Sequence, residues 1–570
     1  MAMVRITING RELTVDSGLT VLQAAKQAAI DIPTLCHHPA LSDIGACRIC
    51  LVEVAKQRAL QPACTFPVSE GMEVQTESPK VVAARKFVLE LLFSERNHYC
   101  MYCQMSGDCE LQALAYRYGL DHWTYDRPYE PMPVDGSRAY FMLDHNRCIL
   151  CRRCIRACEE ISANHTLGTR QRGAKTMISA DLNVPVGESS CVTCGTCLQV
   201  CPTGALIDRA SAYRGRETEV ERTRSVCAAC PVGCGIEVVH RANHVVRIEG
   251  DWDAEPSHGL LCVAGRFQPL DEVRPRVTAP LVRRNGRLEA VGWDTAIAAA
   301  AAGLGKARTR AGIATARATN ETFRALAGAF DLAATWQAPL EKLEFGTAGS
   351  LADIASADAI VVAGADPAQT HRVVAYLIRR ALDHGARLLL IGGKGTDLEP
   401  NATLSVTDAQ AERAVKVATG ASSPVVVYGG GLGKGAAKAL KALGGNARFI
   451  ALPEGTNAVG AEQAGVRPWS GTTRVDALYL LAGDDPVVPE RLPAARFLVV
   501  QSAYHSPLTE RADVVLPSPA WHERSGHLTN LEGRVRAVEA VCTAPAGVPA
   551  EWQALVSLAE RLGRPVKTQA

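Results

Sequence analysis

The first 80 residues show the pattern of a small β-rich domain. Apolar and polar positions alternate in Val4–Ile8 and in Glu12–Val15, and Asn9-Gly10 lies between the two runs. Two such runs joined by Asn-Gly predict a two-residue β-hairpin. The next run, TVLQAAKQAA, has helical periodicity, and Pro33 stands beyond its end. We therefore expect a hairpin and a short helix in residues 1–80.

Three cysteine-rich segments follow. Residues 81–140 begin with an amphipathic helix, VVAARKFVLELLF, and continue into a loop. Residues 141–212 hold an internal repeat, because the run that starts at Cys148 recurs at Cys191. The charged stretch RGRETEVERTR separates this repeat from a further cysteine group within 220–275. We expect each segment to be a small domain.

The pattern changes in residues 276–570. Apolar strand-like runs alternate there with helical stretches; the runs are AIVVAGADP, RLLLIGGKG, PVVVYGGG, RFIALPEG, ALYLLAGDDP, RFLVVQS and ADVVLP. Such alternation predicts a doubly wound α/β domain with a mostly parallel sheet.

Composition and hydropathy argue against a nucleic-acid-binding, secreted or membrane-spanning protein. The 570 residues include 61 Lys and Arg against 59 Asp and Glu, so no basic surplus favours nucleic acid as the main partner. The start, MAMVRITINGRELTV, lacks the apolar core of a signal peptide. The longest apolar stretch, Ala296–Leu304, is shorter than the roughly 20 residues that span a bilayer. We expect a cytoplasmic protein with no direct membrane span, which reaches the inner face of a membrane only through partners.

The cysteines are unevenly distributed. Of 20 cysteines, 19 lie between Cys36 and Cys262, and Cys542 stands alone as an expected buried spectator thiol. In a reducing compartment, clustered cysteines bind metal more often than they form disulfides.

The first group has the spacing C-x10-C-x2-C-x13-C and comprises Cys36, Cys47, Cys50 and Cys64. Four thiolates near one loop can hold a [2Fe–2S] cluster, and the preceding hairpin and helix fit a ferredoxin-like β-grasp scaffold. A zinc site is the alternative. His37 and His38 adjoin Cys36, but four cysteines already complete the ligand set.

The second group contains three cysteines and a nearby histidine: His98, Cys100, Cys103 and Cys109. Three cysteines are one ligand short of a [4Fe–4S] cluster, and His98 is the natural fourth. In the alternative, His98 is an ordinary loop residue and another group completes the cluster.

The internal repeat carries two copies of the bacterial ferredoxin run C-x2-C-x2-C-x3-C. In this run the fourth cysteine ligates the other cluster. The expected ligands of one [4Fe–4S] cluster are Cys148, Cys151, Cys154 and Cys201. Those of the other are Cys191, Cys194, Cys197 and Cys158. Four arginines surround the first run, either raising the cluster potential or forming a solvated face: Arg147, Arg152, Arg153 and Arg156.

The last group has the spacing C-x2-C-x3-C followed by a distant cysteine, and comprises Cys227, Cys230, Cys234 and Cys262. It predicts a fifth cluster, of the [4Fe–4S] type, with a structural zinc ribbon as the alternative. Nineteen cysteines plus His98 thus supply four ligands for each of five clusters, one [2Fe–2S] and four [4Fe–4S].

This order of motifs resembles the large iron–sulfur subunit of respiratory complex I. It is also similar to NAD-dependent formate dehydrogenases and to the electron-input part of NAD-linked hydrogenases. Stretches such as GSLADIASADAIVVAGADP and ERADVVLPSPAWHERSGHLTNLEGRV resemble the molybdopterin-oxidoreductase domain. Two features depart from the complex I pattern. The family usually spaces its histidine as H-x3-C, whereas position 96 is Arg here. Complex I also generally lacks the second ferredoxin cluster, so the intact repeat favours the soluble dehydrogenase and hydrogenase relatives.

The resemblance does not extend to molybdenum chemistry. A formate dehydrogenase-type site needs a cysteine or selenocysteine on the metal, and no cysteine lies between Cys262 and Cys542. Family enzymes often carry lysine two positions after the last cluster cysteine, where this chain has Ala264. We expect the 276–570 domain to hold no Mo- or W-pterin.

The expected function is that of an iron–sulfur electron-transfer subunit in a multi-subunit NAD(P)H-linked oxidoreductase, rather than a complete enzyme. NADH gives up two electrons as hydride, whereas clusters move one at a time, so a flavin must separate the pair. No flavin or nicotinamide site stands out, which places FMN and NAD on a flavoprotein partner. A hydrogenase, formate dehydrogenase or quinone module is the expected further partner. The alternative is a self-contained Mo/W-pterin formate dehydrogenase subunit.

Overall fold

The hairpin at the start of the chain is the edge of a five-stranded sheet. The computed structural model describes residues 2–125, 130–338, 340, 343, 345–470, 474–487 and 489–566. Strands β1 (Met3–Ile8) and β2 (Arg11–Asp16) pair antiparallel around the predicted turn at Asn9-Gly10. The sheet order is β2-β1-β5-β3-β4, with β3 at Leu51–Val54, β4 at Gln61–Pro62 and β5 at Met72–Gln75. The predicted helix forms as α1 (Val21–Gln27), capped by Thr20.

Two helices frame the loop that carries His98. Helix α2 (Pro79–Glu95) begins at the N-cap Ser78 and has Pro in its first turn, where a missing N–H costs nothing. Its buried stripe, at steps of four residues, is Val81, Arg85, Leu89 and Phe93. Helix α3 (Glu110–Arg117) begins directly after Cys109.

The internal repeat of the sequence is also a repeat of backbone structure. The first run contains α4 (Arg153–Arg156), which continues into a π-helical turn at Ala157–Ile161, and the second run contains α5 (Thr196–Gln199). Positive φ angles occur at matching places, at Leu150 and Arg152 in one loop and at Thr193 and Gly195 in the other. The supporting strands are β6 (Val134–Asp135), β7 (Phe141–Asp144), β8 (Leu167–Arg170), β9 (Met177–Ala180) and β10 (Leu206–Asp208).

The chain divides into two units at Val220 and Glu221, inside the charged stretch predicted as a linker. The end of that stretch is not a linker, because Glu221–Val226 forms strand β11. Strand β11 pairs with β12 (Gly235–Arg241), which pairs in turn with β13 (His244–Gly250), all antiparallel.

The second unit contains two mostly parallel sheets, whereas we expected one. A six-stranded sheet has the order β18-β23-β22-β19-β20-β21 and an eight-stranded sheet the order β15-β14-β27-β26-β25-β16-β17-β24. The first four predicted runs form β19 (Ala359–Ala363), β20 (Arg387–Ile391), β22 (Pro424–Gly429) and β23 (Arg448–Leu452). The last three form β25 (Ala477–Gly483), β26 (Phe497–Ser502) and β27 (Val514–Pro517). Alternation of strands and helices does not specify which strands share a sheet.

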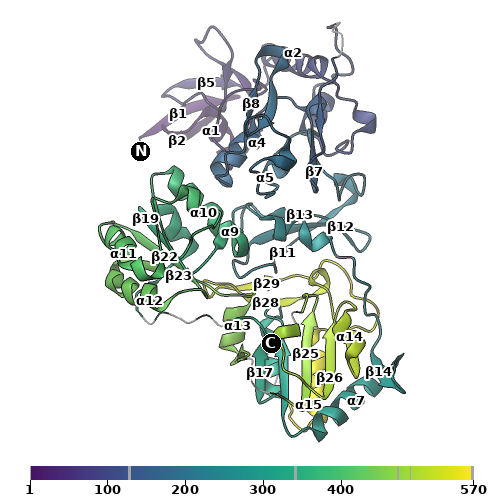
Figure 1. Cartoon of the computed structure of the whole chain (residues 1–570). Coiled ribbons are helices and arrows are strands. Elements are labelled where there is room, and N and C mark those ends of the chain that lie inside the picture. Colours follow the sequence, from purple (N-terminus) through teal and green to yellow (C-terminus); the bar gives the residue numbers. More distant parts are fainter. Residues whose placement is uncertain are drawn as a thin grey trace. The chain divides into compact units, whose positions relative to one another are not determined.

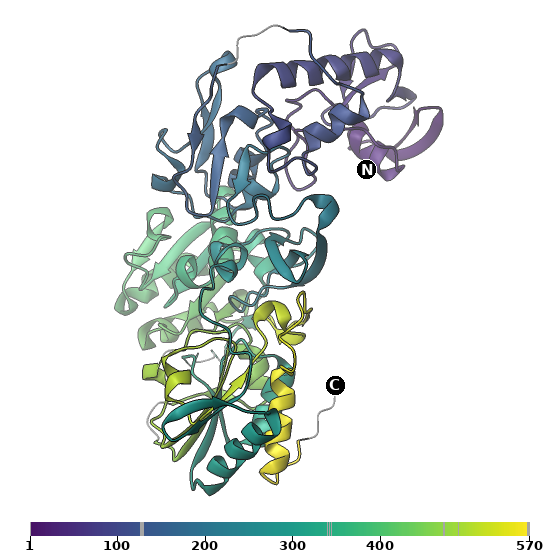
Figure 2. The same cartoon turned by 90° about the vertical axis from the view of Figure 1, so that its right-hand side faces the viewer.

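Helices cover both parallel sheets of the second unit (Figure 1). On the eight-stranded sheet, α7 (Trp293–Lys306) and α15 (Glu551–Arg561) lie side by side, as the turned view shows (Figure 2). Its other elements are β14 (Leu281–Arg284), β15 (Arg287–Ala290), β16 (Arg310–Ala314), α8 (Asn320–Ala329), β17 (Leu332–Thr335) and β24 (Arg467–Pro468). On the six-stranded sheet they are β18 (Thr347–Ala348), α10 (Arg372–Asp383), β21 (Leu404–Val406), α11 (Ala411–Thr419) and α12 (Lys434–Leu440). The expected 276–570 domain includes residues 567–570, which lie outside the described residues.

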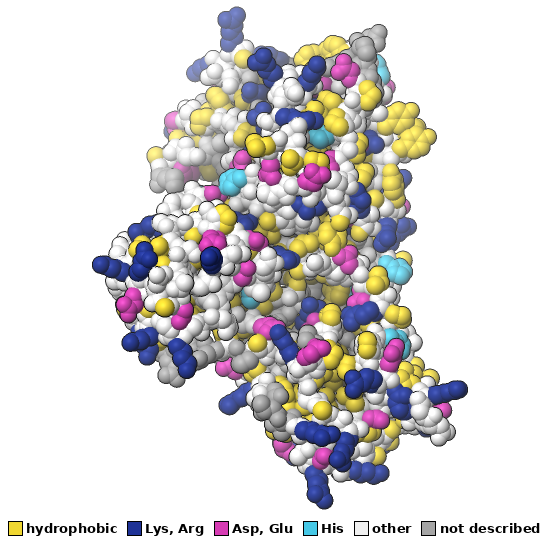
Figure 3. Space-filling model, in the orientation of Figure 1, with side chains coloured by type: hydrophobic (Ala, Val, Ile, Leu, Met, Phe, Trp, Pro, Cys, Tyr) yellow, Lys and Arg dark blue, Asp and Glu magenta, His cyan; other side chains and the backbone are white. Residues whose placement is uncertain are grey.

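Charged side chains of both signs are scattered over the face in view (Figure 3). The apolar stretch Ala296–Leu304 belongs to α7, and across the described residues no helix combines the length and apolarity needed to cross a membrane.

Candidate iron–sulfur sites

The first cysteine group lies between α1 and β3 and just after β4. All four sulfur-bearing residues are buried: Cys36, Cys47, Cys50 and Cys64. The Sγ atoms of Cys50 and Cys64 are 3.4 Å apart, and the amide of Cys36 donates to Cys47 Sγ at 3.3 Å. Hydrogen bonds from the Cys47 and Cys64 thiols lower the pKa of Cys36. The fold thus concentrates four sulfurs and supporting N–H donors in one place.

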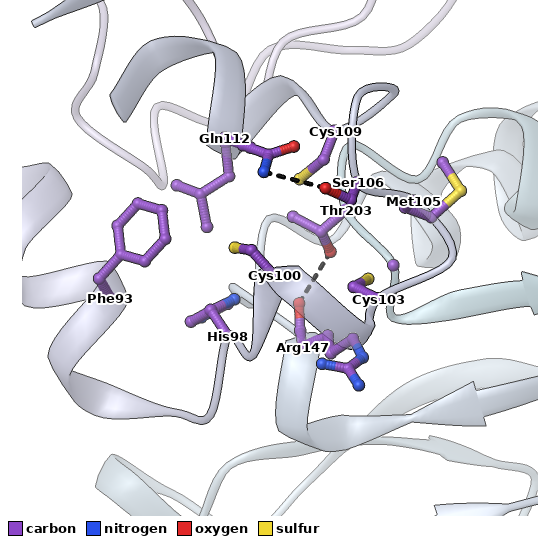
Figure 4. Close-up of a pocket in the computed structure, with 12 residues that line it drawn as sticks. Phe93, His98, Cys100, Cys103, Met105, Ser106, Cys109, Gln112, Arg147 and Thr203 are labelled. Carbon is purple, nitrogen blue, oxygen red and sulfur yellow. Dashed lines mark hydrogen bonds between the residues drawn. The ribbon is translucent and has the colours of Figure 1, made fainter. Parts of the chain in front are cut away.

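The second group lines a single cavity between α2 and α3. His98 and the sulfurs of Cys100, Cys103 and Cys109 all face this cavity, beside Phe93 (Figure 4). Cys100 starts a 3-10 turn and Cys109 is the N-cap of α3. Burial raises the pKa of Cys109 to about 12, so without a nearby cation this residue is a neutral thiol.

The buried ring of His98 has one nitrogen atom without a hydrogen-bond partner. Its ring hydrogen-bonds the backbone of Leu92, while Nε2 is buried and has no hydrogen-bond partner. Burial lowers the pKa of His98 to about 4, which keeps the ring neutral and its lone pair free at neutral pH. Arg96, at the position where the family usually has its histidine, instead donates to the carbonyl oxygens of His145 and Thr176 at 2.8 and 2.6 Å.

The segment after Cys201 forms the opposite wall of this cavity. Thr203 and Gly204 line it, and a Cβ added at Gly204 would lie 2.7 Å from Cys103 Sγ. The amide of Glu110 donates to the carbonyl of Pro202 at 3.0 Å. No local pattern in the sequence indicates this wall, because its residues lie far from Cys103 in the chain.

Each ferredoxin run has the fourth cysteine of the other run nearby. Electrostatic repulsion from Cys201 and Cys148 adds to burial in raising the pKa of Cys151. Repulsion from Cys194 and Cys191 acts in the same way on Cys158, whose pKa rises to about 12. The structure therefore brings Cys201 to the first run and Cys158 to the second.

The last group lies in the second unit: three of its cysteines are in the loop between β11 and β12, and Cys262 is the N-cap of α6 (Val263–Arg266). Mutual repulsion adds to burial in raising the pKa of three of its cysteines, Cys227, Cys230 and Cys234, and burial raises that of Cys262. Burial is the larger cause throughout and raises the pKa of Cys227 to about 12. A Cβ added at Gly265 would lie 2.9 Å from Cys227 Sγ.

A cavity of about 480 Å³ adjoins this group and is lined by Cys227, Ala264, Arg317, Asp484 and Trp521, among others. Two of its charged groups have partners, since Arg317 pairs with Asp485 at 3.3 Å and Asp484 with Arg524 at 2.7 Å. In the described part of the chain, no three His, Cys, Asp or Glu side chains lie together in the geometry of a single-ion site.

The arginines around the first ferredoxin run are not one solvated face. Arg153 and Arg156 are 4% and 5% exposed, whereas Arg152 is exposed. Arg147 is partly buried and pairs with Asp144 at 3.2 Å. A further buried arginine, Arg85, donates to the carbonyls on either side of Cys50 and had no signal in the sequence beyond its place in an apolar stripe.

Five family models match the chain in series. They describe a 2Fe-2S iron-sulfur cluster binding domain (1–79), an NADH-ubiquinone oxidoreductase-G iron-sulfur binding region (85–123), an NADH-quinone oxidoreductase subunit 3 ferredoxin-like domain (139–207), a molybdopterin oxidoreductase Fe4S4 domain (220–269) and molybdopterin oxidoreductase (276–422 and 434–561). The domain content is therefore a [2Fe–2S] domain, [4Fe–4S] domains and a molybdopterin-oxidoreductase domain.

Relatives match over nearly the whole chain. NADH-quinone oxidoreductase subunit 3 of Thermus thermophilus is 30% identical over 98% of this chain and 83% of that protein. The mitochondrial NADH-ubiquinone oxidoreductase 78 kDa subunit of Candida albicans is 28% identical over 99% of this chain and 83% of its own length. NADPH-Fe(3+) oxidoreductase subunit alpha of Geobacter sulfurreducens is 28% identical over 98% of this chain and 81% of its own length.

A solved structure of NAD+-reducing [NiFe]-hydrogenase shares 34% identity over 38% of this chain and 91% of that chain, with a TM-score of 0.36. The near-complete match to the Thermus thermophilus relative and the ordered series of family models place the chain: it belongs to the family of the iron–sulfur subunit 3 of NADH-quinone oxidoreductase, which includes the mitochondrial 78 kDa subunit.

Proposed function

We propose that this chain is the electron-conducting iron–sulfur subunit of an NAD(P)H-linked oxidoreductase complex. The observation that carries the proposal is the sorting of ligands: 19 of 20 cysteines and His98 fall into five groups of four. The names of the relatives, which include NADH and NADPH oxidoreductases, support a nicotinamide as the ultimate electron donor or acceptor.

The ligand sets follow from these groups. Cys36, Cys47, Cys50 and Cys64 hold a [2Fe–2S] cluster. One [4Fe–4S] cluster has three cysteines and His98, and its fit rests on the unpartnered Nε2 that faces the cavity of Cys100, Cys103 and Cys109. The remaining [4Fe–4S] clusters take the two exchanged ferredoxin sets and the Cys227–Cys262 set. When bound, the clusters supply one-electron transfer.

The protein's part is to position, enclose and tune these groups. Short helices after each ferredoxin loop place the fourth cysteine of each run at the other site. Burial around the sulfurs excludes water, and backbone N–H groups donate to Cys47, Cys148 and Cys191. Hydrogen bonds and exclusion of water both influence cluster potentials.

The domain organisation we propose is a series of five domains with boundaries near residues 80, 140, 212 and 275. The chain is a subunit rather than a complete enzyme. A flavoprotein that binds NADH and FMN docks near the [2Fe–2S] group or the His98 group, and a second catalytic subunit exchanges electrons with the other clusters. Thiolate ligands require reducing surroundings, which favours the cytoplasm.

Metal analysis tests the assignment. The chain purified without oxygen should contain about 18 iron atoms (2 + 4 × 4) and matching labile sulfide, with no molybdenum or tungsten. Zinc in place of iron would contradict the cluster assignment, and stoichiometric molybdenum or tungsten would identify a self-contained enzyme instead.

Electron input is tested separately. Dithionite should bleach the visible absorbance of the isolated chain, whereas NADH alone should leave it unchanged because the flavin is on another subunit. Rapid bleaching by NADH alone would contradict the requirement for a flavoprotein partner.

A further inference from the structure

Arg156 spans two of the cysteine groups. It is the last residue of α4, in the first ferredoxin run, and only 5% of it is exposed. One guanidinium nitrogen donates to the carbonyl oxygen of Cys36 at 2.5 Å and also lies 3.4 Å from the carbonyl oxygen of Cys151. The other terminal nitrogen donates to the carbonyl of Ser42. A single side chain therefore connects the backbone of a ligand in the [2Fe–2S] group with that of a ligand in the Cys148 group.

The charge of Arg156 has no carboxylate partner. Among the described residues, no Asp or Glu oxygen lies within 4.0 Å of its guanidinium nitrogens, and its Nε has no hydrogen-bond partner. Arg153, in the first turn of the same helix, differs: it forms an ion pair with Glu110, with N–O distances of 2.5 and 2.8 Å. An isolated buried cation is expensive, so buried charges are normally paired.

Iron–sulfur clusters can supply the missing negative charge. In each all-cysteine cluster, four thiolates and the bridging sulfides outweigh the charge of the irons, and reduction adds one more negative charge. A cation held between two such clusters stabilises the reduced form of each. The three carbonyl contacts fix its position, because the planar guanidinium has little freedom once both terminal nitrogens are engaged.

We propose that Arg156 is a positioning residue that joins the [2Fe–2S] loop to the Cys148 loop and raises the midpoint potentials of both clusters. The proposal rests on the cluster assignment given under Proposed function. Because the same cation contacts the backbone of one expected ligand of each cluster, it should affect both potentials in the same direction.

A second contact holds the same loop without Arg156. The amide and hydroxyl of Ser42 donate to the carboxylate of Glu160, at 2.8 and 2.5 Å. Substitution of Arg156 therefore removes a charge and three hydrogen bonds but leaves another attachment between the two segments.

The test is an EPR-monitored redox titration of the full chain carrying R156M, R156K or R152M. R152M is the matched control, since Arg152 belongs to the same loop but is exposed, and solvent screens its charge. With wild-type iron content, R156M should shift the potentials of the [2Fe–2S] and Cys148-group clusters in the negative direction. R156K, which keeps the charge, should restore most of both shifts, and R152M should change neither by a comparable amount.

Unchanged potentials in iron-replete R156M, or a shift that R152M reproduces, would overturn the proposal. If R156M loses iron, R156K decides: iron retention with near wild-type potentials supports the charge role, whereas iron loss in R156K too makes Arg156 a packing residue only. A wild-type chain without the expected iron would instead refute the proposed function itself.

Discussion

Both terminal nitrogens of Arg153 donate to the carboxylate oxygens of Glu110, at 2.5 and 2.8 Å. This ion pair links the loop after Cys151 to the helix that follows Cys109. Arg153 also lies 3.4 Å from the carbonyl of Val200, which precedes Cys201. Arginine is suited to this role because its fork matches a carboxylate at two points. The pair thus connects the His98 group with the first ferredoxin group, as Arg156 connects the first ferredoxin group with the [2Fe–2S] group.

Substitution of Glu110 by Gln should leave the Arg153 charge uncompensated. Because Arg153 is buried while Glu110 is about half exposed, we expect a loss of roughly 1–2 kcal/mol in stability. The potential of the Cys148-group cluster should rise, since the opposing negative charge is gone. Loss of the cluster absorbance in denaturant and a redox titration measure the two effects. A fall in that potential would contradict the electrostatic account.

Substitution of His98 by Ala should remove one cluster. Iron should drop from about 18 to about 14 atoms per chain, because three cysteines then face an open position. H98C should retain the iron and lower the potential, since a thiolate adds negative charge where the imidazole is neutral. The control is H122A, which alters a histidine that is 76% exposed. If H98A keeps all its iron, another residue completes the site.

Two glycines approach cluster cysteines too closely for any side chain. G204A should displace Cys103 and reduce iron at the His98 site, and G265A should displace Cys227 and affect only the cluster of the second unit. The matched control is G168A, because a Cβ there meets nothing within 4 Å. EPR spectra of the reduced variants distinguish the sites. Wild-type spectra for both variants would show that the neighbouring sulfurs can move freely.

His371 predicts a pH dependence that is independent of the clusters. Burial lowers its pKa from 6.5 to about 4, so the unfolded chain binds a proton more readily than the folded one between these values. The contribution of His371 to the free energy of unfolding is therefore fully present above about pH 6.5 and is lost as the pH falls towards 4. The expected loss from this residue is about 2 kcal/mol between pH 7.5 and 5.

The H371Q variant tests the direction of this pH dependence of stability. Its thermal midpoint should fall less steeply between pH 7.5 and 5 than that of the wild type, although it loses the hydrogen bond between Nε2 and the carbonyl of Pro453. H384Q, which changes an exposed histidine at the end of the same helix, should keep the wild-type slope. Equal slopes in all three proteins would contradict the prediction.

Local spacing predicted the hairpin, the repeat and the grouping of cysteines, because three cysteines within seven residues must share a loop. The structure confirmed the positions of β1, β2 and α1 almost to the residue. Burial of Arg156 and Arg85 could not be foreseen, since arginine is mostly exposed and only tertiary contacts make it otherwise. The contact of Gly204 with Cys103 could not be predicted for a related reason: the two residues are far apart in the sequence, and no local pattern indicates which distant segments come together. The ligand assignments themselves stay predictions.

The wall at Thr203 and Gly204 also bears on the order of assembly during synthesis. Cys109 leaves the ribosome 95 residues before Gly204 (204 − 109), and Cys151 leaves it 50 residues before Cys201 (201 − 151). Neither the His98 site nor the first ferredoxin site is closed until the same short segment has emerged. The segment Cys201–Gly204 therefore sets the earliest time at which either site can be complete.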